Sequence, residues 1–375
     1  MTRRLDTPES LRHLMGADFA FSDQQFAAIT APLEPQVVVA GAGSGKTTVM
    51  AARVVWLVAT GQVRTDEVLG LTFTNKAAGE LATRIRSALR DAGLLPRRGG
   101  PREPHEEEPE EPTVATYNAF AANLLAEEGL RIGHEPDTRV ITDASRYQLA
   151  ARAVARYTGH VELLSDHPPT VIGYLLGLDS AMTEHLVTPD DVRRFQEREL
   201  PRFSDALALE TYKTKADEIR KVLHTFGRRE ELLGLVEAYR RLKHELGLMD
   251  FSDQIELGAR LATERPEVGA AERAKYRIVL LDEYQDTSVA QARMLSRLFS
   301  GESEETGRGH AVTAVGDPNQ AIYGWRGASV SNILHFADTF PAGPGEPPVR
   351  SYPLTVSRRS DRRILEVANH LAEPL

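Results

Sequence analysis

The sequence predicts an α/β fold in which a parallel β-sheet carries an inserted all-helical segment. Five short runs of β-branched and apolar residues predict strands, at 36–40, 67–73, 113–116, 277–281 and 311–315. The runs are continuous rather than alternating, which is typical of parallel strands that are buried on both faces. Four of the five end in polar or glycine-rich residues, and open α/β sheets bind ligands beyond the carboxyl ends of their strands. We therefore expect a binding site at that edge.

The inserted segment is expected between Phe120 and about Leu246, where the pattern changes to helices. A helix start is predicted at Thr188, because a proline and two aspartates follow it in the first turn. Apolar residues then recur every three or four positions, at Leu232, Val236, Tyr239, Leu242 and Leu246. This periodicity is typical of one face of an amphipathic helix.

The composition is that of an ordinary globular protein with two or more domains. Its 375 residues are 41% hydrophobic and 26% charged, and no apolar run approaches the roughly 18 residues of a membrane span. The absence of cysteine excludes disulfides, thiolate catalysis, zinc ribbons and iron–sulfur clusters within the chain. The start of the sequence lacks the apolar core of a signal peptide, so we expect a cytoplasmic protein with no membrane partner.

The net charge of -9 argues weakly against nucleic acid as a partner, since small DNA-binding domains are usually basic. Much of the acid, however, is concentrated in the run EPHEEEPEEP at 103–112. Proline and like charges prevent packing, so we expect a mobile surface loop there, with an interaction tail as the alternative. The remainder of a large enzyme can still carry a local basic groove.

The stretch VVVAGAGSGKTT predicts a strand, a glycine-rich turn and a helix that together bind phosphate. Glycines let backbone amides turn toward phosphate oxygens, while Lys46 neutralises the terminal phosphates and Thr47 offers a hydroxyl to Mg²⁺. The usual pattern begins with glycine, whereas Ala40 stands here. A dinucleotide-binding turn fits less well, because a lysine and a threonine follow and a sixth-position glycine is missing. The expected ATP contacts are Ala42, Gly43, Ser44, Gly45, Lys46, Thr47 and Thr48. A purely structural turn is the alternative.

The stretch RIVLLDEYQDT supplies the acids that such a site needs. Phosphoryl transfer to water requires one acid that holds Mg²⁺ and another that orients or deprotonates the water. Asp282 is placed for the metal and Glu283 for the water. Adjacent carboxylates on a loop are usually only solvated, but here an apolar strand precedes them, which favours a site.

The stretch VGDPNQAIYGWRGA, at 315–328, combines an acid, an amide, two large aromatic residues and an arginine. The rings of Tyr323 and Trp325 and the guanidinium of Arg326 suit flat bases and phosphates. Aromatic residues in a small cluster are more often part of a core. The flanking glycines and proline favour a loop, and hence a ligand platform.

With these motifs, the chain resembles superfamily 1 DNA helicases of the UvrD/Rep/PcrA type, whose ordered motifs cover nearly all of it. FSDQQ is similar to the family's Q motif, LTFTNKAAGEL to the motif after the first, and TYNAF to the TFHSF segment. DFSDQI, at 250–255, is similar to DFDDL, and LTVSRRS, at 354–360, to the fourth motif. The resemblance implies a RecA-like P-loop NTPase sheet with an inserted all-helical subdomain.

The resemblance also implies roles for single residues. Gln25 would read the adenine edge, Gln320 would sense the γ-phosphate, and Arg359 would reach that phosphate from a second motor domain. Tyr323 and Trp325 would stack on bases of single-stranded DNA, with Arg326 contacting DNA or bracing the loop. The same DNA track would be lined by Phe73, Thr74 and Asn75. For Phe73, a place in the core at the end of a strand is the alternative.

Two motifs depart from the family pattern. Asn118 replaces the histidine of TFHSF, and Ser357 and Arg358 replace the asparagine and tyrosine of the fourth motif. Stacking on adenine there would have to come from the Arg358 guanidinium.

By resemblance, the RecA-like ATP-binding domain comprises 1–122 and 247–348, the insertion 123–246, and the truncated start of the second motor domain 349–375. The chain ends at Leu375, before the family's fifth and sixth motifs. We therefore expect these residues to bind Mg-ATP and single-stranded DNA weakly, with little hydrolysis or unwinding by themselves.

The leading functional hypothesis is the ATP- and DNA-binding portion of an ATP-dependent 3′ to 5′ DNA helicase or translocase, acting in repair or recombination. Its partners would be single-stranded DNA, junctions of single- and double-stranded DNA, and a partner subunit in such a complex. One alternative is the motor of a helicase–nuclease subunit of actinobacterial type. Another is an ATP-gated DNA-binding module without turnover. A small-molecule kinase would need the phosphate site but neither the Tyr323 loop nor the DEYQD run.

Overall fold

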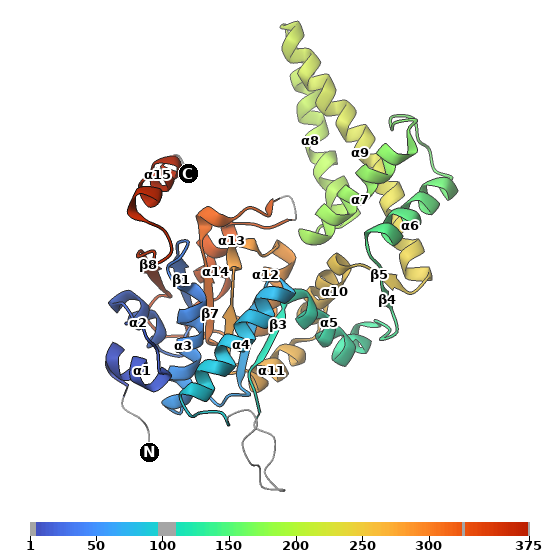
Figure 1. The fold of residues 1–375 in the computed structure, drawn as a ribbon. Helices are drawn as coiled ribbons and strands as arrows, with labels where there is room; N and C mark the ends of the chain where they lie inside the picture. Colours follow the sequence, from blue (N-terminus) through green and yellow to red (C-terminus); the bar gives the residue numbers. More distant parts are fainter. Residues whose placement is uncertain (1–4, 97–109, 325–326, 374–375) are drawn as a thin grey trace. The chain divides into compact units, whose positions relative to one another are not determined.

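The computed structural model describes residues 5–96, 110–324 and 327–373 (Figure 1). Most of the acidic run at 103–112 lies outside these residues, as do Trp325 and Arg326. The chain folds into two compact units. Unit 1 consists of Met1–Leu124 and Ala259–Leu375, and unit 2 of Leu125–Gly258.

Unit 1 is built on a six-stranded sheet in which every strand pair is parallel. The strands are β1 (Gln36–Ala40), β2 (Val68–Thr72), β3 (Thr113–Thr116), β6 (Ile278–Leu281), β7 (Val312–Gly316) and β8 (Arg350–Leu354), in the order β3-β2-β6-β7-β1-β8. The predicted parallel sheet is confirmed. The sixth strand, β8, was not predicted, because as an edge strand it is mostly exposed and contains Pro353, which only an edge tolerates.

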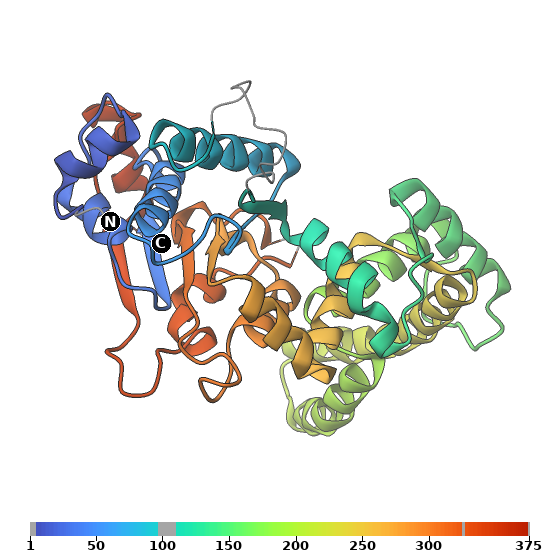
Figure 2. The same cartoon turned by 90° about the horizontal axis from the view of Figure 1, so that it is seen from below.

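Helices cover both faces of this sheet. The helices that lie wholly in unit 1 are α1 (Pro8–Met15), α2 (Asp23–Ile29), α3 (Lys46–Ala59), α4 (Asn75–Asp91), α11 (Pro266–Lys275), α12 (Val289–Phe299), α13 (Ser331–Leu334), α14 (Phe336–Thr339) and α15 (Arg362–Ala372). Figure 2 shows α3 and α4, in blue and teal, on one face, and α11 and α12, in orange, on the other. Strands β2, β6 and β7 are consequently buried along their whole length.

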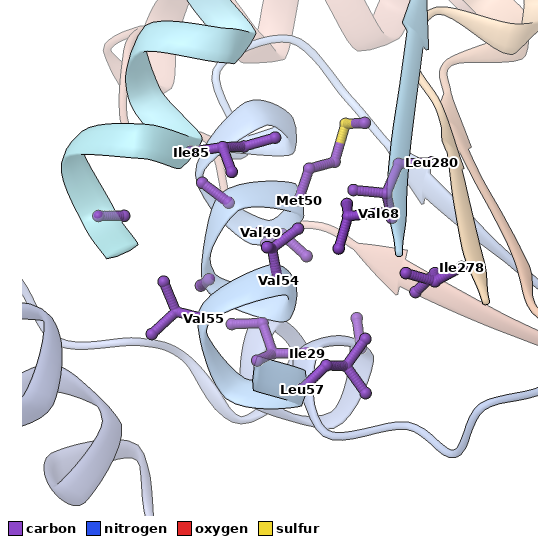
Figure 3. Close-up of a cluster of buried hydrophobic side chains, with 14 of the residues drawn as sticks. Ile29, Val49, Met50, Val54, Val55, Leu57, Val68, Ile85, Ile278 and Leu280 are labelled. Atoms are coloured by element: carbon purple, nitrogen blue, oxygen red, sulfur yellow. The ribbon is translucent and has the colours of Figure 1, made fainter. Parts of the chain in front are cut away.

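The core between α3 and the sheet is made of aliphatic side chains (Figure 3). Val54 and Leu57 of α3 lie near Ile29 of α2, and Met50 faces Val68 and Leu280 of the neighbouring strands. All of them are fully shielded from solvent. Burying each such side chain stabilises the fold by roughly 1.5 to 3 kcal/mol, which fixes α3 on the sheet.

A buried arginine holds the end of α2 in place. Arg53 of α3 is fully buried, and its guanidinium donates to the carbonyl oxygens of Ile29, Ala31 and Pro32 at 3.1, 2.7 and 2.8 Å. Burial lowers the pKa of Arg53 to about 10, which still leaves it charged at neutral pH. A cation at the carboxyl end of a helix also interacts favourably with the helix dipole.

Unit 2 is mainly helical and has its own core. Its elements are the end of α5 (Tyr117–Glu128), η1 (Gly129–Ile132), β4 (Arg139–Val140), α6 (Asp143–Arg156), α7 (Pro168–Glu184), α8 (Pro189–Leu209), α9 (Lys213–Glu245), β5 (Leu248–Met249) and the start of α10 (Phe251–Glu264). Thr188 caps α8 in a capping box with Asp191, as its sequence pattern predicts. Beyond the helices, β4 and β5 pair in a short parallel ladder.

Unit 2 extends to Gly258, whereas the sequence analysis placed the end of the insertion at 246. The reason is a buried ionic cluster. Lys243 is 4% exposed, and its Nζ lies 2.7 Å from Asp253 Oδ1 and 3.3 Å from Asp250 Oδ2. Burial alone would lower the pKa of Lys243, but the charges of Asp179, Asp253 and Asp250 raise it. These ion pairs attach the start of α10 to α9.

None of the helices among residues 5–96, 110–324 and 327–373 is long and apolar enough to span a membrane.

Near the start of β7, the ring of His310 stacks on Phe299 with 5.7 Å between centroids. Burial, together with the charge of Arg273, lowers the pKa of His310 to about 4. A histidine in an unfolded chain titrates near about 6.5. As the pH falls between these values, the unfolded state takes up the proton first, and the fold is destabilised.

We therefore expect the free energy of unfolding of the wild type to fall as the pH is lowered from about 7.5 to about 5. In His310→Phe, which lacks the titrating group, this fall should be smaller by about 2 kcal/mol. Urea unfolding at several pH values measures this difference. The matched control is His13→Phe, because His13 is exposed. Equal pH slopes in wild type and His310→Phe would contradict the effect.

Candidate functional site

The predicted site residues gather at the carboxyl edge of the sheet, where parallel strands place all their C-terminal loops. Every one of them that the structure describes lies in the loops after β1, β2, β6, β7 and β8 or in the first helical turn that follows such a loop, except Gln25 at the start of α2. The sheet therefore brings together motifs that lie far apart in the sequence.

The glycine-rich loop between β1 and α3 has the geometry of a phosphate cradle. Gly43 and Gly45 have φ angles of +77° and +88°, in the region that favours glycine. The hydroxyl of Ser44 donates to the carbonyl of Gly41 at 2.7 Å, which tightens the turn, while Ala42 is exposed at its tip. Helix α3 begins at Lys46, so its first amides face this loop, and amides at a helix N-terminus bind anions.

The first turn of α3 carries three of the seven predicted ATP contacts. Lys46 and Thr47 are half-buried there. The hydroxyl of Thr48, the third, accepts a hydrogen bond from Arg84 of α4 at 3.3 Å. Thr48 is thereby tied to the neighbouring helix.

Lys46 forms an ion pair across the site, with its Nζ 3.0 Å from Glu283 Oε2. The lysine side chain is 12% exposed and the glutamate side chain 34%, so the pair is partly shielded from water. Glu283 has a φ of +49°, which is unusual for a residue with a side chain. Such strained backbone is typical of functional sites. The glutamate thus neutralises the charge of the lysine.

Asp282 lies beside this pair, at the end of β6, and is 6% exposed. Burial, and then the negative charge of Glu283, raises the pKa of Asp282 to about 6. Its Oδ2 accepts a hydrogen bond from Thr72 at 3.3 Å, whereas its Oδ1 is buried and has no hydrogen-bond partner among the described residues. A buried acceptor left unpaired is costly, and a bound cation would satisfy it.

These donors fit Mg²⁺, which prefers oxygen ligands and is commonly held by one or two carboxylates together with phosphate oxygens. Asp282 would supply the carboxylate and Thr47 the hydroxyl. Within the described ranges, no group of three or more His, Cys, Asp or Glu side chains forms a metal cage. The site thus fits a metal that arrives with a phosphate.

Gln25 is buried at the start of α2, and both ends of its amide are engaged. Its Nε2 donates to the carbonyl of Ser44 at 2.9 Å. Its Oε1 accepts from the backbone N–H of Ser22 at 3.1 Å and from Arg358 at 3.0 Å. The side chain therefore connects the cradle to the segment after β8. The predicted adenine contact of Gln25 stays a prediction.

The segment after β8 lies directly against the cradle. The backbone N–H of Arg358 donates to the carbonyl of Gly43 at 2.9 Å. The Arg358 guanidinium lies over the ring of Phe19, 5.8 Å from the centroid. A Cβ added at Gly43 would lie 2.5 Å from the Cβ of Arg359, so Arg359 is next to the phosphate loop. That Arg359 reaches a phosphate stays a prediction.

The loop after β7 begins within the same site. Asp317 is 9% exposed, and its Oδ2 accepts from the Nε2 of Gln320 at 2.5 Å. Farther along, the ring of Tyr323 stacks on that of Phe73, with 5.0 Å between centroids and 25° between planes. Both rings are partly exposed rather than part of a closed core. Trp325 and Arg326 lie outside the described residues.

Thr74 and Asn75 follow Phe73 at the start of α4. Thr74 is the N-cap of this helix, since its hydroxyl accepts from the N–H of Ala77 at 3.1 Å. Asn75 is exposed in the first turn. The capping bond gives Thr74 a structural role, and DNA contacts by either residue stay predictions.

Sequence reasoning passed over Gln285, which lies between the acids of the DEYQD run. It is 1% exposed, and its Nε2 donates to Glu283 Oε2 at 2.9 Å and to Asp286 Oδ2 at 3.1 Å. Its Oε1 accepts from the backbone N–H of Asp317 at 3.1 Å. The signal that could have found it is an amide between two acids directly after a buried strand.

Comparison with known proteins assigns the family. The profile of the UvrD/REP helicase N-terminal domain matches residues 21–341, which is most of the chain. The chain belongs to this family. The expected resemblance is confirmed. In this UvrD/REP domain, Asn118 replaces the family's histidine, and its side chain accepts a hydrogen bond from Gln291 of α12 at 3.2 Å.

Curated relatives include DNA helicase II of Haemophilus influenzae, 26% identical over 93% of this chain, and the ATP-dependent DNA helicase PcrA of Leuconostoc citreum, 27% identical over 93%. DNA helicase II of Escherichia coli is 26% identical over 94%. The matched region covers 40%, 38% and 40% of these three relatives. The UvrD/REP domain thus spans less than half of their length.

The two glycines at the start of the cradle offer a matched pair of substitutions. Gly43→Ala should lower the free energy of unfolding by about 2 kcal/mol, because its φ is positive and the new Cβ would meet Arg359 and Ser357. Gly41→Ala should change it by less than about 0.5 kcal/mol, since nothing lies within 4 Å of its added Cβ. Urea unfolding without nucleotide measures both, and equal effects would contradict this geometry.

Proposed function

We propose that this UvrD/REP domain binds Mg-ATP and single-stranded DNA as the first motor domain of an ATP-dependent DNA helicase or translocase. The observation that carries the proposal is the loop after β7. It begins at Asp317, beside the acid pair and the phosphate cradle, and continues to Tyr323, which stacks on Phe73. One short segment therefore joins a nucleotide-type site to an aromatic platform.

The curated relatives support the same reading, because their names describe DNA helicases and one is called ATP-dependent. A 3′ to 5′ polarity, a role in repair or recombination, junction DNA as a substrate and a partner subunit are the finer parts of the proposal. They rest on the motif resemblance. A cytoplasmic location belongs with them.

In the proposed chemistry, Lys46 leaves its ion pair with Glu283 and binds the terminal phosphates of ATP instead. Asp282 and Thr47 hold Mg²⁺, which neutralises phosphate charge when bound. Once Lys46 has turned to the phosphates, the Glu283 carboxylate is available to orient and deprotonate the attacking water. Gln320 and Arg359 contact the γ-phosphate from two sides. Gln25 orients the adenine, with Arg358 beside it.

On the DNA side, Phe73 and Tyr323 form the described part of the platform. Contacts of Trp325 and Arg326 with DNA rest on the motif resemblance. Stacking of a base on an aromatic ring contributes roughly 1 to 3 kcal/mol. This is strong enough to hold a strand and weak enough to release it at each step. Because stacking is tolerant of sequence, the platform would bind single strands without base specificity.

The motor of a helicase–nuclease subunit would use the same residues as the motor of a helicase. It therefore remains an alternative for the function of the longer protein. An ATP-gated DNA-binding module without turnover is the other alternative. The paired Lys46 and Glu283 argue for turnover, because a binding module needs no catalytic base. The stacked Phe73 and Tyr323 argue against a small-molecule kinase, which needs no base platform.

Tyr323→Ala should weaken binding of a fluorescent oligothymidylate by about tenfold, because one stacking platform is lost. Its affinity for an ATP analogue alone should change much less. Lys46→Ala is the reciprocal control, with ATP-analogue binding weakened at least about tenfold and nucleotide-free DNA binding preserved. If Tyr323→Ala binds DNA as the wild type does, the platform is assigned to the wrong residues.

A further inference from the structure

We propose that Gln285 is the positioning residue that transmits the state of the phosphate site to the DNA-binding loop. The proposal rests on the function proposed above, because it assigns the connection between its two sites. Gln285 is not itself a catalytic group. It acts through Glu283 on one side and through Asp317 on the other.

The Gln285 amide presents a hydrogen-bond donor to Glu283 and an acceptor to the backbone of Asp317. Its Nε2 donates to the carboxylate oxygen of Glu283 at 2.9 Å, and its Oε1 accepts from the backbone N–H of Asp317 at 3.1 Å. A glutamate here would repel Glu283, and a leucine would remove the hydrogen bond to each partner. The amide carries its donor nitrogen and its acceptor oxygen on the same carbon, so one side chain can bond both partners at once.

The fit around Gln285 is close. A Cβ added at Gly316 would lie 2.3 Å from Gln285 Oε1 and 2.8 Å from a methyl carbon of Ile333. The glutamine is also 1% exposed, so no water can replace a bond that it loses. A buried polar group that loses its partner is penalised. Gln285 should therefore follow its partners when they move rather than release them.

A change at the phosphate site reaches Gln285 through one atom. The same Oε2 of Glu283 accepts from Lys46 at 3.0 Å and from Gln285 at 2.9 Å. When Lys46 turns to a phosphate, Gln285 remains as the donor to that oxygen. Any rotation of the Glu283 carboxylate then shifts the glutamine and, through it, the backbone of Asp317.

Asp317 in turn controls the beginning of the aromatic loop. Its carboxylate accepts from the N–H of Asn319 at 3.0 Å and from the side chain of Gln320 at 2.5 Å. These bonds hold the short helix η3 (Pro318–Gln320) to Asp317. Tyr323 lies three residues after Gln320, the last residue of η3. A shift of Asp317 is therefore passed through η3 to the ring that stacks on Phe73.

The other end of the loop is fixed to the same acidic segment. Ser288 forms an antiparallel bridge with Ala328, and the N–H of Ser329 donates to the carbonyl of Thr287 at 3.0 Å. The side chain of Asn332 donates to the same carbonyl at 2.9 Å. The far end of the loop is held by Thr287 and Ser288, so a movement of Gln285 shifts the near end, at Asp317, relative to the far end.

The test is the coupling between the two ligands. The affinity for a fluorescent oligothymidylate is measured with and without a saturating, non-hydrolysable Mg-ATP analogue, and the ratio is the coupling factor. We expect a wild-type ratio of at least about fivefold in either direction, which is typical of linked sites. In Gln285→Leu the ratio should fall to between about one and two, while each ligand alone binds within about threefold of the wild type.

Gly316→Ala displaces Gln285 without altering it, and it should reduce the coupling factor in the same way. In the double variant Gln285→Leu with Gly316→Ala, the coupling factor should be close to that of Gln285→Leu alone, because both substitutions act through one contact. The matched control is Gln36→Leu, since Gln36 is equally buried in β1 and contacts Thr313 and Ala28 rather than the acid pair. It should keep the wild-type ratio.

A wild-type coupling factor in folded Gln285→Leu would overturn this inference while leaving the proposed function intact. If Gln285→Leu does not fold, as judged by circular dichroism, the Gly316→Ala ratio decides in its place. A wild type that binds neither ligand would overturn the proposed function itself. A wild type that binds both independently would overturn the inference.

Discussion

The parallel alignment of the six strands is the constraint on which the site depends. It places the C-terminal loops of β1, β2, β6, β7 and β8 at one edge, although the residues they carry are up to about three hundred positions apart in sequence. The hydrophobic burial of β2, β6 and β7 between two helical layers keeps this edge rigid. Small displacements of the loops can therefore be passed between neighbours rather than absorbed.

At this edge several residues have energetically unfavourable environments, and the buried core stabilises the fold enough to tolerate them. Asp282 is buried with an oxygen left unpaired, its pKa is raised, and Glu283 has a left-handed backbone. Each feature is unfavourable by itself, and in the proposed function each would be relieved or used on binding of a cation and a phosphate. Departures from good local structure of this kind are expected at functional sites.

The sequence predicted the local parts of this arrangement well. Strand runs and the glycine turn before Lys46 are visible because burial on both faces and positive φ angles impose their own residue types. Contacts between distant segments were not predictable. The bonds of Arg358 to Gln25, of Gln285 to Asp317 and of Lys243 to Asp253 depend on which elements the fold places side by side.

The central claim is that a ligand in the glycine cradle alters the aromatic loop through the sheet edge. Hydrogen exchange measured by mass spectrometry, with a non-hydrolysable Mg-ATP analogue and without DNA, tests it most directly. We predict altered exchange at 317–324 as well as at the cradle, with peptides of α8 unchanged. Protection confined to the cradle, with 317–324 exchanging as in the free protein, would contradict the account.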